Sequence, residues 1–188
     1  MILKKFLLLI IIFTPLIYTN AQEAKETLQS HSEISVGLLF VGYSYETPVV
    51  DKLTVKGNLD YQIGFAINSD YIKYFSAFSL GIEPRYYYNI NNRIRKGKNT
   101  KNNAANFFSF EASYQPDFLK TFDYEEYHVK AKDSYNLVPS WNIRRNINNS
   151  NFTYEIKLGI GFSTIYYDDL PNEKLTYPAI NAKISYNF

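Results

Sequence analysis

The sequence predicts an all-β protein: a closed antiparallel up-and-down β-barrel that crosses a membrane, with eight strands expected. Segments of about ten residues alternate between apolar and polar side chains, and no helical period competes with them. Successive side chains of a strand point to opposite faces, so each segment forms a ribbon with one apolar face. About 9–11 residues are enough for a tilted strand to cross a bilayer. In lipid such strands must close into a barrel, because a sheet edge cannot be left unpaired there.

Residues 1–21 have the pattern of a secretory signal peptide. Lys4 and Lys5 precede an apolar run over 6–17. Thr19-Asn20-Ala21 is compatible with the small-residue cleavage site of a signal peptidase. The apolar run is too short for a membrane-spanning helix, which needs about 20 residues. We therefore expect 1–21 to be a signal peptide, 22–32 a periplasmic N-terminal segment and 33–188 a transmembrane barrel in the outer membrane.

Bulk composition excludes several classes of function. Without Lys4 and Lys5, the 20 basic residues fall to the number of acidic ones, 18, so the mature chain is neutral. A neutral chain gives no reason to expect nucleic-acid binding. The absence of cysteine excludes disulfides and thiolate metal sites. The 18 tyrosines suit the rim of a membrane slab, where one end of a side chain is apolar and the other wet.

Six segments share the alternating pattern. They are 53–67, 74–90, 108–115, 134–144, 152–163 and 179–188. A seventh, 33–45, is apolar on both faces over part of its length, so its pattern assigns no register. An even strand number of at least eight is usual for such barrels. The eighth strand is expected in 47–56, turning at Gly57-Asn58, or in 22–32. Pro84 and Pro139 lie in mid-strand on the apolar face, and each predicts a bulge.

The loops follow from the strands. If Phe188 ends in the periplasm, segments 117–133 and 168–176 face outside, while 91–106 and 148–151 face the periplasm. The short, Asn-rich 148–151 suits a periplasmic turn. Segment 91–106 is long, with five basic residues and no acid. It could instead face lipopolysaccharide outside, which would require an odd strand or a different pairing. A solvated basic loop without a partner is the plainer expectation.

The polar faces of the strands define the expected barrel interior. Because side chains fill the interior of an eight-stranded barrel, charges there must pair with one another. We expect an internal salt-bridge network; a selective narrow pore through the same charges is the alternative. The expected interior charges are Lys56, Asp60, Glu83, Arg85, Glu111, Arg144, Glu155, Lys157 and Lys183.

Candidate catalytic chemistry is limited by the presence of only two histidines. In His31-Ser32-Glu33 the adjacent side chains of an extended chain point to opposite faces, which prevents the hydrogen bond a nucleophile needs. His128 lies near three carboxylates, in a loop of a kind that is usually solvated rather than metal-binding. No catalytic, cofactor or metal site is expected. The aromatics of this loop form the candidate surface-contact site: Phe118, Phe122, Tyr124 and Tyr127.

The last strand carries the clearest alternation and a first resemblance. Ile180, Ala182, Ile184, Tyr186 and Phe188 share one face. A chain that ends on an aromatic residue inside such a strand resembles the C-terminal signature of outer-membrane β-barrels. That resemblance implies outer-membrane lipid and lipopolysaccharide as surroundings, and the barrel assembly machinery as a partner of this strand.

Two further stretches resemble the small outer-membrane β-barrel proteins of Bacteroidota, an uncharacterised family with a porin-like, OmpA-type architecture. One is Glu83-Pro84-Arg85-Tyr86-Tyr87-Tyr88-Asn89 with the basic residues and Asn106-Phe107-Phe108 that follow it. The other is Pro139-Ser140-Trp141-Asn142-Ile143-Arg144-Arg145-Asn146. The likeness runs from about residue 34 to the end. It implies location and architecture, and it implies no reaction.

We therefore expect a small non-enzymatic outer-membrane barrel with a structural, adhesive or surface-interaction role, whose surface partner the sequence does not identify. A narrow channel for ions or small solutes is the first alternative. Two others are an outer-membrane enzyme that modifies lipid or cleaves peptides, and a soluble lipocalin-like barrel whose apolar face turns inward around a ligand.

Overall fold

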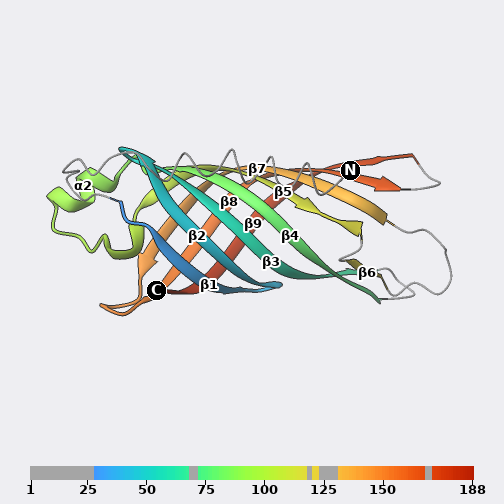
Figure 1. Ribbon diagram of the computed structural model, residues 1–188, viewed down its shortest axis with the longest axis horizontal. Helices are drawn as coiled ribbons and strands as arrows, with labels where there is room; N and C mark the ends of the chain where they lie inside the picture. The colour runs from blue at the N-terminus through green and yellow to red at the C-terminus, as the bar shows by residue number, and fades with distance from the viewer. Residues whose placement is uncertain (1–27, 68–71, 118–119, 123–130, 168–170) are drawn as a thin grey trace, which may run out of the picture.

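The computed structural model describes residues 28–67, 72–117, 120–122, 131–167 and 171–188, which form one antiparallel barrel (Figure 1). The strand order is β3-β2-β1-β9-β8-β7-β5-β4, and β3 also pairs with β4, so the sheet closes. β6 (Lys120–Phe122) pairs with β4 beyond the end of β5. Eight strands therefore form the closed barrel, as predicted.

The strands match the six alternating segments closely. Their bounds are β1 His31–Gly37, β2 Phe40–Val50, β3 Leu53–Ile67, β4 Ile72–Tyr86, β5 Asn106–Gln115, β7 Ala131–Asn146, β8 Phe152–Tyr167 and β9 Glu173–Asn187. Two short helical turns, α2 Ile90–Arg95 and η2 Lys101–Asn103, lie between β4 and β5. No helix of the described residues is long and apolar enough to cross a bilayer.

The stretch 33–45 holds two strands, and this resolves the missing eighth. A turn at Leu38-Leu39 joins β1 to β2. Outward side chains fall on even positions before the turn and on odd positions after it, as exposed Val36 and Val41 show. The stretch therefore looks apolar on both faces. Placing the eighth strand in 47–56 is wrong, because β2 runs to Val50 and β3 begins at Leu53. Of the other expected segment, 22–32, the structure describes 28–32, where β1 begins at His31.

Neither mid-strand proline produces the predicted bulge. The β4–β5 ladder skips Pro84, and the β7–β8 ladder skips Pro139, but the register is the same on both sides of each gap. A missing N–H removes a pairing without inserting a residue. The register shifts lie elsewhere, at Pro48/Val50 and at Ala131/Ser134.

Polar faces turn inward and apolar faces outward all around the barrel. Glu33, Lys56 and Arg144 are almost fully buried, whereas Ile34, Leu80 and Leu158 are about half exposed. Following the cross-strand pairs once around from Phe152 leads back to β8 at Thr164. The strands are therefore staggered and tilted, as closure requires.

The barrel has two different ends. Phe188, α2 and the turn 147–151 lie at one end, called here the C-terminal end, and β6 lies at the opposite, far end (Figure 1). Segment 91–106 thus shares an end with 148–151 and Phe188, as the strand count predicted. The described strands contain neither the odd strand nor the different pairing that an opposite placement would require.

Residues 87–105, called here the end cap, close the C-terminal end. Tyr87, Ile90, Ala105 and Phe107 form a buried apolar cluster, against which Leu28 packs. Asn103 Nδ2 donates to the carbonyl of Gln29 at 2.9 Å, and its Oδ1 accepts from the Gln29 amide at 2.8 Å. The basic loop expected from the sequence is therefore solvated on one side only, because its apolar residues fill the barrel mouth.

The barrel wall is lower at the β1–β2 hairpin, where β1 ends before the neighbouring strand β9 does. β9 pairs with β1 only over Lys183–Asn187, and among the described residues its segment 173–182 pairs with β8 alone. Asn181 points inward by alternation, yet it is exposed because no strand covers it on that side. The interior is therefore sealed at the C-terminal end and accessible towards the far end.

Candidate functional site

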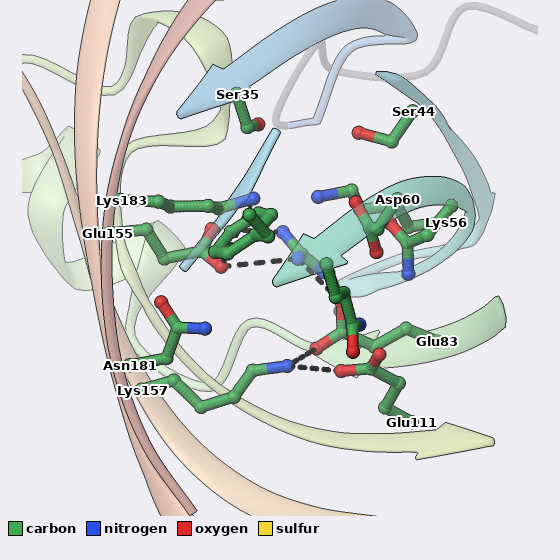
Figure 2. Close-up of a pocket in the computed structure, with 14 residues that line it drawn as sticks. Ser35, Ser44, Lys56, Asp60, Glu83, Glu111, Glu155, Lys157, Asn181 and Lys183 are labelled. Atoms are coloured by element: carbon green, nitrogen blue, oxygen red, sulfur yellow. Dashed lines mark hydrogen bonds and ion pairs between the residues drawn. The ribbon is translucent and has the colours of Figure 1, made fainter. Parts of the chain in front are cut away.

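The structure places all nine expected charges in the barrel interior, where all but Asp60 form ion pairs with other described residues. Figure 2 shows seven of them, including Asp60, Glu155 and Lys183. Glu33 and Glu46 also lie in the interior. The sequence did not assign them, because the pattern of their strands gave no clear register. Among the described residues the interior holds six carboxylates and five cations: Glu33, Glu46, Asp60, Glu83, Glu111 and Glu155 with Lys56, Arg85, Arg144, Lys157 and Lys183.

Arg144 on β7 is the deepest cation, with no exposed surface. Its Nη2 donates to Glu33 and, at 2.6 Å, to Asn187 Oδ1, and its Nη1 donates to Glu46 at 3.3 Å. These partners come from β1, β9 and β2. Because a guanidinium offers five donors in a planar fork, one side chain can join strands on opposite sides of the barrel.

Arg85 on β4 contacts three carboxylates, of which Glu46 is shared with Arg144. Its Nε and Nη2 donate to Glu83 at 3.0 and 2.6 Å, and its Nη1 donates to Glu46 and to Glu155 at 3.2 Å each. Its Cζ also lies 4.6 Å from the centre of the Phe107 ring, a cation–π distance. The buried apolar cluster to which Phe107 and the end-cap residues Tyr87 and Ile90 belong therefore meets the ion network at this guanidinium.

The lysines extend the network towards the far end. Lys56 and Lys183 both reach Glu33, and Lys183 lies 3.6 Å from Glu155. Figure 2 shows Lys157 reaching Glu83, at 3.1 Å, and Glu111. Every one of the five cations thus has at least one carboxylate partner, which is the condition for keeping charges in a confined interior.

Glu46 links the network to the end cap. It accepts from Thr54 Oγ1 at 2.7 Å, from Tyr87 at 2.7 Å and from Asn103 Nδ2 at 3.2 Å. Burial and then the Glu46 carboxylate raise the pKa of Tyr87 well above its usual value. The Tyr87 hydroxyl therefore remains a donor to Glu46 at any physiological pH.

His31 is a structural member of this network. Its Nε2 lies 3.1 Å from Arg144 Nη2, and its Nδ1 lies 3.2 Å from the carbonyl of Gln29. Arginine only donates, so Nε2 accepts, Nδ1 carries the proton and the ring is neutral. Ser32 points the other way, with its hydroxyl 3.1 Å from that of exposed Tyr43. His31 and Ser32 therefore do not form a nucleophile–base pair.

A small polar cavity remains on the far side of the network. It measures about 80 Å³ and is bordered by Asp60, Asn58, Gln62 and Asn181 among others. Such a volume holds a few water molecules. Within the described structure Asp60 makes no ion pair. The cavity does not continue to the C-terminal end, where Asn142, Arg144 and Thr54 have no exposed surface.

The candidate surface-contact loop lies largely outside the described residues. This applies to Phe118, Tyr124 and Tyr127, and also to His128. Phe122 belongs to β6, where its backbone pairs with Phe75. Among the residues that the structure describes, no group of side chains is arranged to hold a metal ion.

The outer surface carries a second pattern that the alternation alone did not define. Along β8 the outward residues run from aromatic to aliphatic and back to aromatic, and all but the half-buried Thr164 are exposed: Phe152, Tyr154, Ile156, Leu158, Ile160, Phe162 and Tyr166. At the C-terminal end the ring centres of Tyr88 and Phe108 lie 5.3 Å apart, and Trp141 Nε1 donates to the hydroxyl oxygen of Tyr88 at 2.9 Å. At the far end the ring centres of Tyr114 and Tyr135 lie 5.0 Å apart.

Comparison of the chain with protein-family models, curated proteins and solved structures finds no match. The resemblance to the Bacteroidota barrels therefore stays a prediction. The residues themselves define a class: an eight-stranded antiparallel β-barrel with a charge-paired interior and an apolar exterior.

Proposed function

We propose that this chain is an outer-membrane β-barrel with a closed, non-conducting interior, which serves without enzymatic activity as an anchor for the segments at its two ends. The exterior carries this proposal. Large apolar side chains from every barrel strand are exposed, among them Ile34, Tyr43, Leu59, Leu80, Phe110, Leu137, Leu158 and Ile184.

Such a surface is unfavourable in water. Soluble monomers rarely expose a contiguous apolar patch above a few hundred Å². Each Å² of apolar surface left in contact with water costs about 25 cal/mol of free energy. A bilayer removes this cost. The order of side chains along β8 also fits, because lipid-facing apolar bands are flanked by aromatic girdles at both interfaces.

The interior favours an anchor over the alternatives. A lipocalin-like binder would need an apolar interior, whereas this one is lined with paired ions. A channel would need a continuous bore, whereas the ion network and the end cap fill the C-terminal end. His31, the histidine of the described residues, is held by Arg144 and a carbonyl, which gives an enzyme no support.

The orientation follows from the proposed location. Periplasmic turns of such barrels are short, and the C-terminal end carries the turns 51–52 and 147–151. We therefore place this end and the end cap in the periplasm and the far end outside the cell. The segments at the far end then become the surface available to an external partner.

Fractionation and conductance together test this proposal. The mature protein should be recovered with outer membranes, should shift in gel mobility on heating, and should give no steps of current in planar bilayers. Recovery as a monomer in detergent-free aqueous extract would contradict the membrane location. Steady conductance of the purified barrel would replace the anchor with the channel.

A further inference from the structure

Two arginines lie together on the outside of the barrel, at the C-terminal end. Arg145 occupies an outward position of β7, in line with Trp141 and Ile143, and pairs across strands with Tyr154. Arg93 belongs to α2 of the end cap. Both side chains are partly exposed. Neither takes part in the interior network.

A short chain of hydrogen bonds fixes the two residues relative to each other. The amide of Arg93 donates to the carbonyl of Asn89 at 3.1 Å, and the side-chain oxygen of Asn89 accepts from the amide of Asn106 at 2.9 Å. Asn106 Oδ1 in turn accepts from Arg145 Nη2 at 2.6 Å, and Arg145 Nη1 donates to the carbonyl of Arg144 at 2.7 Å. This chain places the backbone of Arg93 beside the strand end that carries Arg145, and the Arg93 guanidinium itself donates through Nη2 to the carbonyl of Asn99 at 2.9 Å.

These two cations have no counter-charge of their own. Segments 87–105 and 143–151 contain no acidic residue, and within the described residues neither arginine forms an ion pair. Burial and then the Arg145 charge lower the pKa of Arg93, and its buried Nε has no hydrogen-bond partner. Inside the barrel every cation of the described residues is paired, whereas Arg93 and Arg145 are held on the outside by uncharged acceptors only, Arg93 by the carbonyl of Asn99 and Arg145 by Asn106 Oδ1 and the carbonyl of Arg144.

The surroundings are those of a membrane interface. Tyr88 accepts hydrogen bonds from Trp141 Nε1 at 2.9 Å and from Asn106 Nδ2 at 3.3 Å, so the aromatic rim connects directly to the residue that holds Arg145. Trp and Tyr at such rims lie at the level of lipid headgroups. Arginine forks match phosphate oxygens in a bidentate manner.

We propose that Arg93 and Arg145 bind the phosphate of an anionic glycerophospholipid, whose acyl chains lie along outward Ile143 and Trp141. This inference rests on the proposed membrane location. A lipid fits better than a free phosphate, because Arg145 is continuous with the apolar outward face of β7 and not with an aqueous pocket.

The only tryptophan of the chain, Trp141, reports on this site directly. The protein is reconstituted in phosphatidylcholine vesicles that contain a minor fraction of one lipid with brominated acyl chains, either phosphatidylglycerol or phosphatidylcholine. Bromine quenches indole fluorescence on contact. We expect stronger quenching by the brominated phosphatidylglycerol, corresponding to a preference of about fivefold per arginine engaged, since each such charge contributes about 1 kcal/mol.

The double variant Arg93→Gln, Arg145→Gln should lose this preference, whereas Lys98→Gln, which removes one exposed charge from the same end cap, should keep it. Heat-dependent gel mobility verifies that each variant forms the barrel. Equal quenching by both brominated lipids in the native protein, or a preference that survives in the double variant, would overturn the site and leave the membrane location intact. No quenching by either lipid would overturn the membrane location as well.

Discussion

Arg144 shows what a single side chain contributes to this barrel. It has no exposed surface, and it donates to Glu33, Glu46 and Asn187 from three other strands. Removing one member of a buried ion pair leaves its partner uncompensated and costs about 3–5 kcal/mol. Lys157 also pairs with two carboxylates, but its side chain retains 14% of its exposure. Water in the cavity can therefore replace part of what Lys157 supplies.

We expect Arg144→Gln to lower the free energy of unfolding by about 3–5 kcal/mol and Lys157→Gln to lower it clearly less. Both are measured by urea unfolding of the reconstituted protein, followed by Trp141 fluorescence, with circular dichroism as the control for strand content. Equal losses in the two variants would contradict the distinction between the sealed and the wet part of the interior.

Residue alternation predicted nine of the interior charges because strands expose one polar face consistently. Glu33 and Glu46 escaped because the turn between their strands is Leu38-Leu39. Hairpin turns are recognised by Gly, Asn or Asp, and neither leucine marks one. The change of phase at this turn was thus visible only as an apparently two-sided apolar stretch.

At the scale of elements, the end cap is the part least predictable from sequence. Its charged and Asn-rich composition predicts a solvated loop, and its exposed side agrees with that prediction. Ile90, Ala104 and Ala105 are nevertheless fully buried. They follow neither a helical nor a strand period, because the shape of the barrel mouth determines which residues fill it.

The end cap should control access to the interior from its own end. Thr54 points into the barrel there with no exposed surface, and the chain has no native cysteine. Thr54→Cys in the detergent-solubilised protein should resist a polar maleimide, and should react once residues 90–103 are replaced by a short turn. Asn181→Cys, at the open end, should react in both backgrounds. A reactive Thr54→Cys in the complete chain would show that the cap does not seal this end.

At the scale of the whole molecule, closure of the sheet separates two environments. Because β3 pairs with β4, each described barrel strand has a neighbour on both of its sides. The inner faces of the strands carry ions, and the outer faces carry apolar residues. The sequence predicted this architecture and its strand number. The low wall at the β1–β2 hairpin could not be predicted, because it depends on how far each neighbouring strand continues.

The central claim is that the outward faces meet lipid, and a spin-label scan along β8 tests it most directly. Single cysteines from Phe152 to Ser163, labelled one at a time in reconstituted protein, are compared for collisions with oxygen and with a water-soluble nickel complex. Labels at Ile156, Leu158 and Ile160 should collide with oxygen and exclude nickel, with a period of two residues along the strand. Free access of nickel to these three positions would contradict the claim.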